Sequence, residues 1–192
     1  MAFQHPLAKK NPAAAKSIEI AGRIKALEDE IAALRAAPRA VAQDYVLTDW
    51  DGAEAPLSSL FGGKDELIVV HNMGASCDYC TMWADGFNGI VPYVAERAAF
   101  VVASPDDIAT QKAKAKKHGW SFRMVSAKDS RFFADLGFED ADGAPYPGVS
   151  TFRKTATGAI ELLASAPFGP GDKFCAVFSF FDLLPQKESI AA

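Results

Sequence analysis

A pair of cysteines separated by two residues marks the point in this sequence that most restricts its fold. Cys77 and Cys80 follow the apolar run Leu67–His71, which is bounded by charge and glycine as a buried central strand is. A helical pattern begins at the pair and reaches Arg97, where two glycines and Pro92 are expected to interrupt or kink it. The chain is therefore limited to folds in which a strand feeds directly into a helix that opens on a dithiol.

The rest of the sequence alternates between strand and helix patterns. A strand is expected to lead from Tyr45 into an Asp-Gly turn, further strands at 100–104, 122–125, 149–152 and 160–163, and helices at 14–35, 57–61, 105–118, 129–137 and 172–184. Ser104 is the expected N-cap of the helix that begins at Pro105. This alternation predicts an α/β fold with a mostly parallel sheet, helices on both faces and an antiparallel edge from the closing hairpin.

The first 40 residues have a separate pattern. Apolar residues recur along the first helix at alternating spacings of four and three positions and form a seam of the heptad type, and Pro38 closes the segment. The seam residues are Ile20, Ile24, Leu27, Ile31 and Leu34. A seam of about two heptads is too short to hold a coiled coil alone, so the helix packs on its own domain or on a second subunit. We divide the chain into a helical arm, residues 1–40, and a domain, residues 41–192. If the helix packs on a second subunit, the protein is a homodimer.

Charge and hydropathy restrict partners and location. The chain has 24 acidic and 20 basic residues among 192, and its net charge of −4 argues against nucleic acid or an anionic membrane as the main partner. We interpret the basic residues within 112–118 as a solvated helix end rather than an anion site. No apolar run approaches membrane-spanning length, the first residues lack the apolar core of a signal peptide, and three cysteines fit a reducing compartment. We expect a cytoplasmic protein with no membrane partner.

The dithiol is the candidate reactive group. The free amides and dipole at a helix start favour a thiolate, so Cys77 is the expected nucleophile and Cys80, one turn further in, the resolving thiol. A zinc site is one alternative, but it needs two further ligands from Cys175, His71 and His118, and the sequence has no second ligand pair. The other alternative is that the two cysteines occur together by chance and only pack in the core. We expect redox chemistry and no metal, with Cys175 as a packing residue.

Several motifs resemble known families. The segments Leu47-Thr-Asp-Trp-Asp-Gly52 and Leu57-Ser-Ser-Leu-Phe-Gly62 resemble the entry of longer thioredoxin-fold proteins, such as peroxiredoxins and membrane-anchored thiol–disulfide oxidoreductases. More closely, Cys77-Asp-Tyr-Cys80-Thr-Met-Trp83, Gly119-Trp120-Ser-Phe122 and Asp182-Leu-Leu-Pro185 resemble a bacterial family known only as a thioredoxin-like domain of unknown function. The resemblance covers about three quarters of the chain and implies a thioredoxin-like mixed sheet with helices on both faces.

The resemblance also implies roles around the dithiol. His71 precedes Cys77 by six residues, the offset at which thioredoxins carry a buried acid, so an imidazole there is a candidate base toward Cys80; the alternative is a hydrogen-bonded histidine at a strand end. Thioredoxins place a cis-proline opposite the dithiol, and the closest match here puts Ser150 at that position, with Pro147 three residues early. The expected substrate-binding residues are Tyr79, Trp83, Pro147, Val149 and Ser150, with core packing as the alternative for Trp83.

One family motif is missing. The peroxiredoxin signature Pro-x-x-x-Thr-x-x-Cys would place threonine at position 74, where this chain has Gly74, so peroxidase chemistry of that kind is not expected. No glycine-rich phosphate loop follows any strand, so no organic cofactor is expected. The predicted function is a thiol–disulfide oxidoreductase that cycles Cys77 and Cys80 and acts on a disulfide-bearing protein or a small thiol. The alternative is a non-catalytic thioredoxin-fold protein that binds a partner or senses oxidation.

Overall fold

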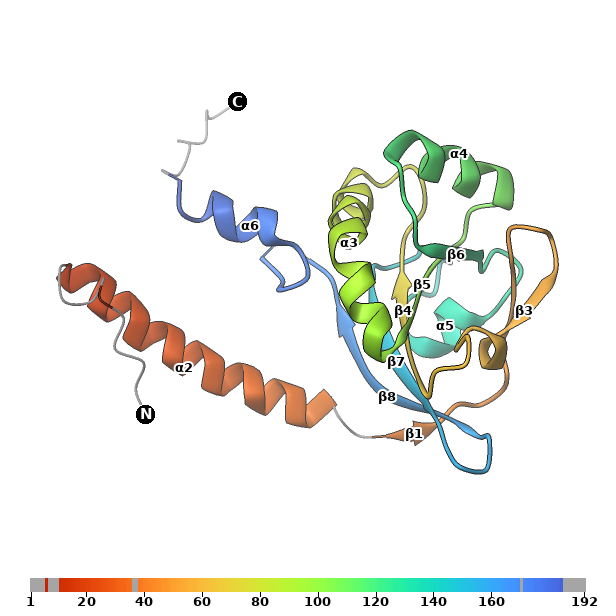
Figure 1. Cartoon of the computed structure of the whole chain (residues 1–192), viewed down its shortest axis with the longest axis horizontal. Coiled ribbons are helices and arrows are strands. Elements are labelled where there is room, and N and C mark those ends of the chain that lie inside the picture. Colours follow the sequence, from red (N-terminus) through yellow and green to blue (C-terminus); the bar gives the residue numbers. More distant parts are fainter. Residues whose placement is uncertain (1–5, 7–10, 36–37, 170, 185–192) are drawn as a thin grey trace. The chain divides into compact units, whose positions relative to one another are not determined.

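The computed structural model describes residue 6 and residues 11–35, 38–169 and 171–184 (Figure 1). The chain divides into two compact units between residues 37 and 38. One unit contains the helix α2 (Pro12–Arg35), and the other contains every element from β1 to α6. The division falls three residues before the end of the expected arm, because residues 39 and 40 form a strand that pairs within the second unit.

The second unit is built around one mixed sheet. Its strands lie in the order β1-β8-β7-β4-β5-β6-β2-β3. The elements are β1 (Arg39–Ala40), β2 (Val46–Thr48), β3 (Glu54–Pro56), the 3-10 helix η1 (Leu57–Ser59), β4 (Glu66–His71), α3 (Asp78–Arg97), β5 (Ala99–Ser104), α4 (Ile108–His118), β6 (Arg123–Ser126), α5 (Phe132–Leu136), β7 (Gly148–Lys154), β8 (Ile160–Pro167) and α6 (Ala176–Phe181).

The α/β class and the mixed sheet are confirmed, but the expectation of a mostly parallel sheet was wrong. Among the described strands, β4 pairs with β5 and β5 with β6 in parallel, and the other pairings are antiparallel. The antiparallel share is larger than expected because β2 and β3 form their own hairpin beside β6, and because β7 runs antiparallel to β4 as well as to β8. Only the central β4-β5-β6 segment follows the βαβ rule.

Two hydrophobic clusters cover the two faces of the sheet. Alternate strand residues face opposite sides, so Val69 and Val101 pack with η1 and α5, while Val70 and Val102 pack with α3 and α4. The helix that carries the dithiol contributes Trp83, Ala84 and Phe87 to the second cluster. Strand β4 is therefore apolar on both faces, as a central strand covered by helices must be.

The helix ends differ in part from the expected ones. Helix α3 runs without interruption through Gly86, Gly89 and Pro92. Asp107 caps α4 in place of Ser104 by accepting a hydrogen bond from the Thr110 backbone N–H, whereas Gly119 ends that helix in the left-handed conformation as expected. The last helix, α6, is shorter than the expected 172–184.

Candidate active site

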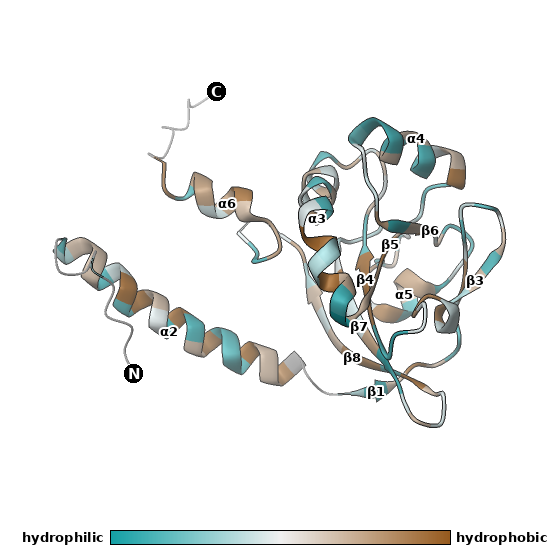
Figure 2. Ribbon diagram, in the orientation of Figure 1, coloured by the Kyte–Doolittle hydropathy of each residue, from teal (hydrophilic) through white to brown (hydrophobic). Residues whose placement is uncertain are grey.

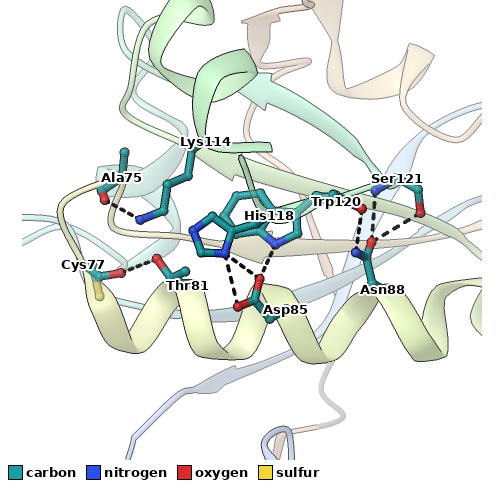
Figure 3. Close-up of polar contacts among 10 residues, drawn as sticks. Ala75, Cys77, Thr81, Asp85, Asn88, Lys114, His118, Trp120 and Ser121 are labelled. Atoms are coloured by element: carbon teal, nitrogen blue, oxygen red, sulfur yellow. Dashed lines mark hydrogen bonds and ion pairs between the residues drawn. The ribbon is translucent and has the colours of Figure 1, made fainter. Parts of the chain in front are cut away.

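The dithiol lies at the beginning of α3, where the sequence places it. Cys77 is the N-cap residue, and its Sγ accepts a hydrogen bond from the Cys80 backbone N–H at 3.0 Å. The Cys77 carbonyl accepts further bonds from the N–H and Oγ1 of Thr81, at 3.1 and 2.9 Å, which fix the first turn (Figure 3). A sulfur held against free helix amides is placed where a thiolate is stabilised.

The two cysteines have different environments. Cys77 is half-buried, whereas Cys80 is buried with 3% of its surface exposed. Burial, followed by a hydrogen bond with Cys77, raises the pKa of the Cys80 thiol to about 12, although a backbone hydrogen bond with Met73 acts in the opposite direction. Cys80 is therefore a thiol at neutral pH, and Cys77 is the sulfur that an incoming molecule reaches first.

The loop that leads into the dithiol is clamped from two other elements. The Asp106 carboxylate accepts a hydrogen bond from the Ala75 N–H at 2.9 Å. Lys114 Nζ donates to the Ala75 carbonyl at 3.0 Å (Figure 3). Asn72 Oδ1 accepts from the Gly74 N–H at 2.8 Å. Together these three contacts hold the backbone before Cys77 on both sides.

Gly74 is required at its position in this loop. Its φ of +110° lies outside the range that other residues adopt readily, and a Cβ there would stand 2.9 Å from Asp106 Oδ1. The Asp106 carboxylate can therefore approach this closely because residue 74 has no side chain.

Asp106 and Lys114 were not among the predicted site residues. Only the sheet topology indicates that these two residues belong to the site. Strands β4 and β5 are parallel neighbours, so the loops after both strands meet at one edge of the sheet. Asp106 follows β5 by two residues and reaches the loop after β4. Lys114 lies in the basic run interpreted as a solvated helix end, and composition alone does not separate it from its neighbours.

A second set of contacts anchors α3 alongside the turn after α4. Asp85 accepts hydrogen bonds from Trp120 Nε1 at 2.7 Å and from His118 Nδ1 at 3.1 Å, and Asn88 bonds the backbone of the following turn (Figure 3). These contacts hold the dithiol helix over its sheet face without touching the sulfurs.

His71 lies at the end of β4 on the sheet face opposite α3. It shares that face with Val69, and its ring stacks on Phe138 with centroids 3.8 Å apart. Nε2 lies 2.9 Å from Ser150 Oγ, which in turn lies 3.0 Å from Ser165 Oγ, while Nδ1 has no hydrogen-bond partner among the described residues. Within the described part of the chain, no hydrogen bond joins His71 to either thiol of the dithiol. Its role as a base stays a prediction.

Burial lowers the pKa of His71 to about 3, and this has a consequence for stability. An unfolded histidine titrates near pH 6.5, so below that pH the unfolded chain binds a proton that the folded protein excludes. The contribution of neutral His71 to the free energy of unfolding is fully present above pH 6.5 and is lost as pH falls toward 3. We expect the free energy of unfolding to fall by about 2 kcal/mol between pH 7.5 and pH 5 from this group alone.

Urea unfolding at the two pH values measures this loss. His71→Gln should unfold more easily at pH 7.5 but lose about 2 kcal/mol less on acidification than the unaltered protein. Val69→Ala is the control, because it loosens packing on the same face of the sheet without removing a titratable group, and it should keep the full loss on acidification. An equal acid loss in His71→Gln would show that His71 is not the group that resists protonation.

The expected substrate-binding residues are not equally accessible. Tyr79 is 59% exposed on α3 and Pro147 is half-buried, whereas Trp83, Val149 and Ser150 are buried. Among the described residues no peptide bond is cis, so the bond before Pro147 is trans. Trp83 stacks on Phe168 and donates from Nε1 to Asp172 at 3.4 Å. Among these five residues, only Tyr79 and Pro147 therefore present accessible surface.

A groove runs along α3 from the turn that carries the dithiol. It has a volume of about 650 Å³ and lies between α3 and the segment that leads into α6; its lining includes Asp78, Thr81, Met82, Ile90, Phe174 and Cys175. The walls are mainly apolar, and the Cys175 side chain is buried in one of them, as a packing role requires. Sequence patterns did not identify this groove, because its second wall comes from residues about 90 positions further along the chain.

Two other features are absent from the described residues. No group of three or more His, Cys, Asp or Glu side chains within them is arranged to hold a metal ion. No helix within the described ranges is long and apolar enough to cross a membrane.

The chain is similar to known proteins in sequence and in fold. A family model described as a bacterial protein of unknown function (DUF899) matches residues 14–189. A chloroplastic peroxiredoxin Q of Triticum aestivum is 26% identical over 160 residues, which cover 83% of this chain and 73% of that protein. A reduced peroxiredoxin, Prx3, of Vibrio vulnificus, solved in complex with H2O2, has a TM-score of 0.57 and 16% identity, covering 78% of this chain and 98% of that chain. A secreted disulfide oxidoreductase of Mycobacterium tuberculosis has a TM-score of 0.50 and 15% identity, covering 73% and 96%. These structural likenesses show a thioredoxin-like fold.

Proposed function

The chain belongs to this bacterial family of unknown function, DUF899, and on that premise we propose that it is a thiol–disulfide oxidoreductase that cycles Cys77 and Cys80. The asymmetry of the pair carries the proposal: an accessible sulfur caps a helix, and a buried thiol lies one turn behind it with its pKa raised to about 12. A nucleophile must meet its substrate, whereas a resolving thiol must stay protonated until the first step is complete.

The reaction balances with these two sulfurs alone. The Cys77 thiolate attacks a substrate disulfide, forms a mixed disulfide and releases half of the substrate as a thiolate. Cys80 then gives up its proton and attacks Cys77 Sγ, which closes the Cys77–Cys80 disulfide and releases the other half. The substrate gains two electrons, and the cysteine pair, starting with Cys77 as a thiolate, loses two electrons and the one proton of Cys80. A small thiol or a dithiol reductase must return the electrons before the next cycle.

Two groups are candidates to accept the proton of Cys80: the imidazole of His71 and the departing substrate thiolate. The buried imidazole of His71 is neutral at physiological pH, which is the form a base requires, but a pKa of about 3 makes it a weak base. The departing substrate thiolate is closer to Cys80 in pKa and arises at the moment when the proton is released. We therefore assign the proton to that thiolate and propose that His71 contributes mainly to packing under the site.

Disulfide chemistry is favoured over peroxide reduction at this site. Several neighbours of similar fold are peroxiredoxins, and the peroxiredoxin signature would require a threonine at position 74. In this chain a Cβ at that position would stand 2.9 Å from Asp106 Oδ1, and the backbone has a φ of +110°. The loop before Cys77 is thus built around glycine and a carboxylate. The proposed substrate is a disulfide, which reaches Cys77 beside Tyr79 and Pro147.

A redox titration tests the proposal. The full chain is equilibrated across a graded dithiol buffer, the thiols are alkylated, and peptides containing Cys77 and Cys80 are quantified by mass spectrometry, with Cys175 as the internal reference thiol. We expect one two-electron transition, shared by Cys77 and Cys80, between roughly −300 and −120 mV, with no change at Cys175. If the pair stays reduced throughout, or each thiol is modified independently, the proposal fails and the binding-protein alternative replaces it.

A further inference from the structure

The helix α2 carries an apolar seam that no described residue of its own unit covers. Asn11 caps the helix by accepting hydrogen bonds from the N–H groups of Ala13 and Ala14, so its start is well defined. The five large residues of the seam expose between 42% and 82% of their surfaces; they are Ile20, Ile24, Leu27, Ile31 and Leu34. Figure 2 shows apolar and polar residues alternating along this helix. An exposed stripe of this kind indicates a surface that another molecule covers.

The heptad register of the seam is unambiguous. The spacing places Ile24 and Ile31 at a positions and Ile20, Leu27 and Leu34 at d positions. The helix begins at Pro12, so the register continues through Ser17 at a and Ala13 at d, small residues that extend the seam to about three heptads. β-Branched residues at a with leucine at d favour a parallel, two-stranded coiled coil.

The charges that flank the seam match a second copy of the same helix. Positions g carry Arg23 and Glu30, and Glu28 occupies an e position. In a parallel pair each g residue faces the e residue five positions later in the partner helix. Arg23 then faces Glu28 of the second copy, and symmetry repeats the contact. Both contacts join opposite charges.

We propose that α2 is a dimerisation helix, which pairs with α2 of a second copy of this chain in a parallel, in-register coiled coil. In an antiparallel pair g positions face g positions and e positions face e positions, so Arg23 meets Glu30 instead of Glu28. In the antiparallel register that buries the whole seam, Glu28 meets Ala21 and makes no ion pair. The charge at position 28 therefore distinguishes the two orientations.

Sedimentation equilibrium of the full chain tests the proposal. The unaltered protein should reach twice the 20.5 kDa mass of one chain with rising concentration. Glu28→Arg should raise the dimer dissociation constant about tenfold or more, because it replaces two attractive contacts by two repulsive ones. Arg23→Glu should do the same. An equimolar mixture of the two variants should dimerise again, since both contacts in the heterodimer join opposite charges.

Asp29→Arg is the matched control, because it makes the same change of charge at the neighbouring outward position f and should leave the dissociation constant within about twofold. Circular dichroism of each variant verifies that helix content is kept. An unaltered chain that stays monomeric at all concentrations overturns the proposal and assigns the seam to packing within the chain. A dimer that survives Glu28→Arg, or a mixture that stays monomeric, overturns the parallel pairing.

Discussion

Replacing Cys77 by serine should abolish disulfide reduction, whereas replacing Cys80 by serine should leave the first attack intact and stop the reaction at the mixed disulfide. The difference follows from the positions of the two sulfurs. Cys77 caps α3 and is half-buried, while Cys80 is buried and its pKa is raised to about 12. A serine hydroxyl does not form the attacking anion near neutral pH, so we expect the rate with Cys77→Ser to fall by roughly a thousandfold or more.

The measurement uses a small aromatic disulfide whose released thiol absorbs visible light. With Cys80→Ser, one equivalent of thiol should appear in a burst, and mass spectrometry should find the substrate half attached to Cys77. Cys175→Ser is the matched control, because Cys175 is buried in the wall of the groove, and it should keep the original rate. A burst from Cys77→Ser, or an equal loss in all three variants, would contradict the assigned roles.

Replacing Gly148 by alanine should destabilise the protein by about 3 kcal/mol, because the added methyl group has no space. A Cβ at this position would lie 2.2 Å from Cε1 of Phe138 and 2.6 Å from the backbone oxygen of Ala166. The Ala166 oxygen belongs to β8, which is paired with β7, so it cannot move without loss of sheet hydrogen bonds. The Phe138 ring stacks on His71, so its displacement also disturbs the packing under the site.

Urea unfolding at pH 7.5 measures the effect of Gly148→Ala. The matched control is Gly89→Ala, where a Cβ meets nothing within 4 Å and the residue lies inside α3. Alanine is about 1 kcal/mol more favourable than glycine in a helix, so the control should be at least as stable as the unaltered protein. If Gly148→Ala unfolds at the same urea concentration as the unaltered protein, the close packing between Phe138 and β7 is wrong.

Much of the local structure was predictable because its signals lie close together in the sequence. The apolar run 67–71 became β4, the dithiol became the first turn of α3, and Gly119 ended α4. Each depends on a periodicity or a cap that acts within a few residues. The motif resemblance around Cys77 likewise identified the thioredoxin-like fold. The heptad seam of α2 was readable for the same reason.

What the sequence by itself determined is therefore the type of most elements, the short strands β1 and β3 excepted, and the place of the dithiol at a strand-to-helix junction. Only the tertiary structure decided which strands pair and in which direction, and hence that β7 runs antiparallel to β4. It also brought Asp106 and Lys114 to the loop before Cys77, and it placed His71 on the sheet face away from α3. The physical reason is that backbone propensity and capping act over a few residues. Strand partners and loop contacts, in contrast, depend on burial shared between residues that are far apart in the chain.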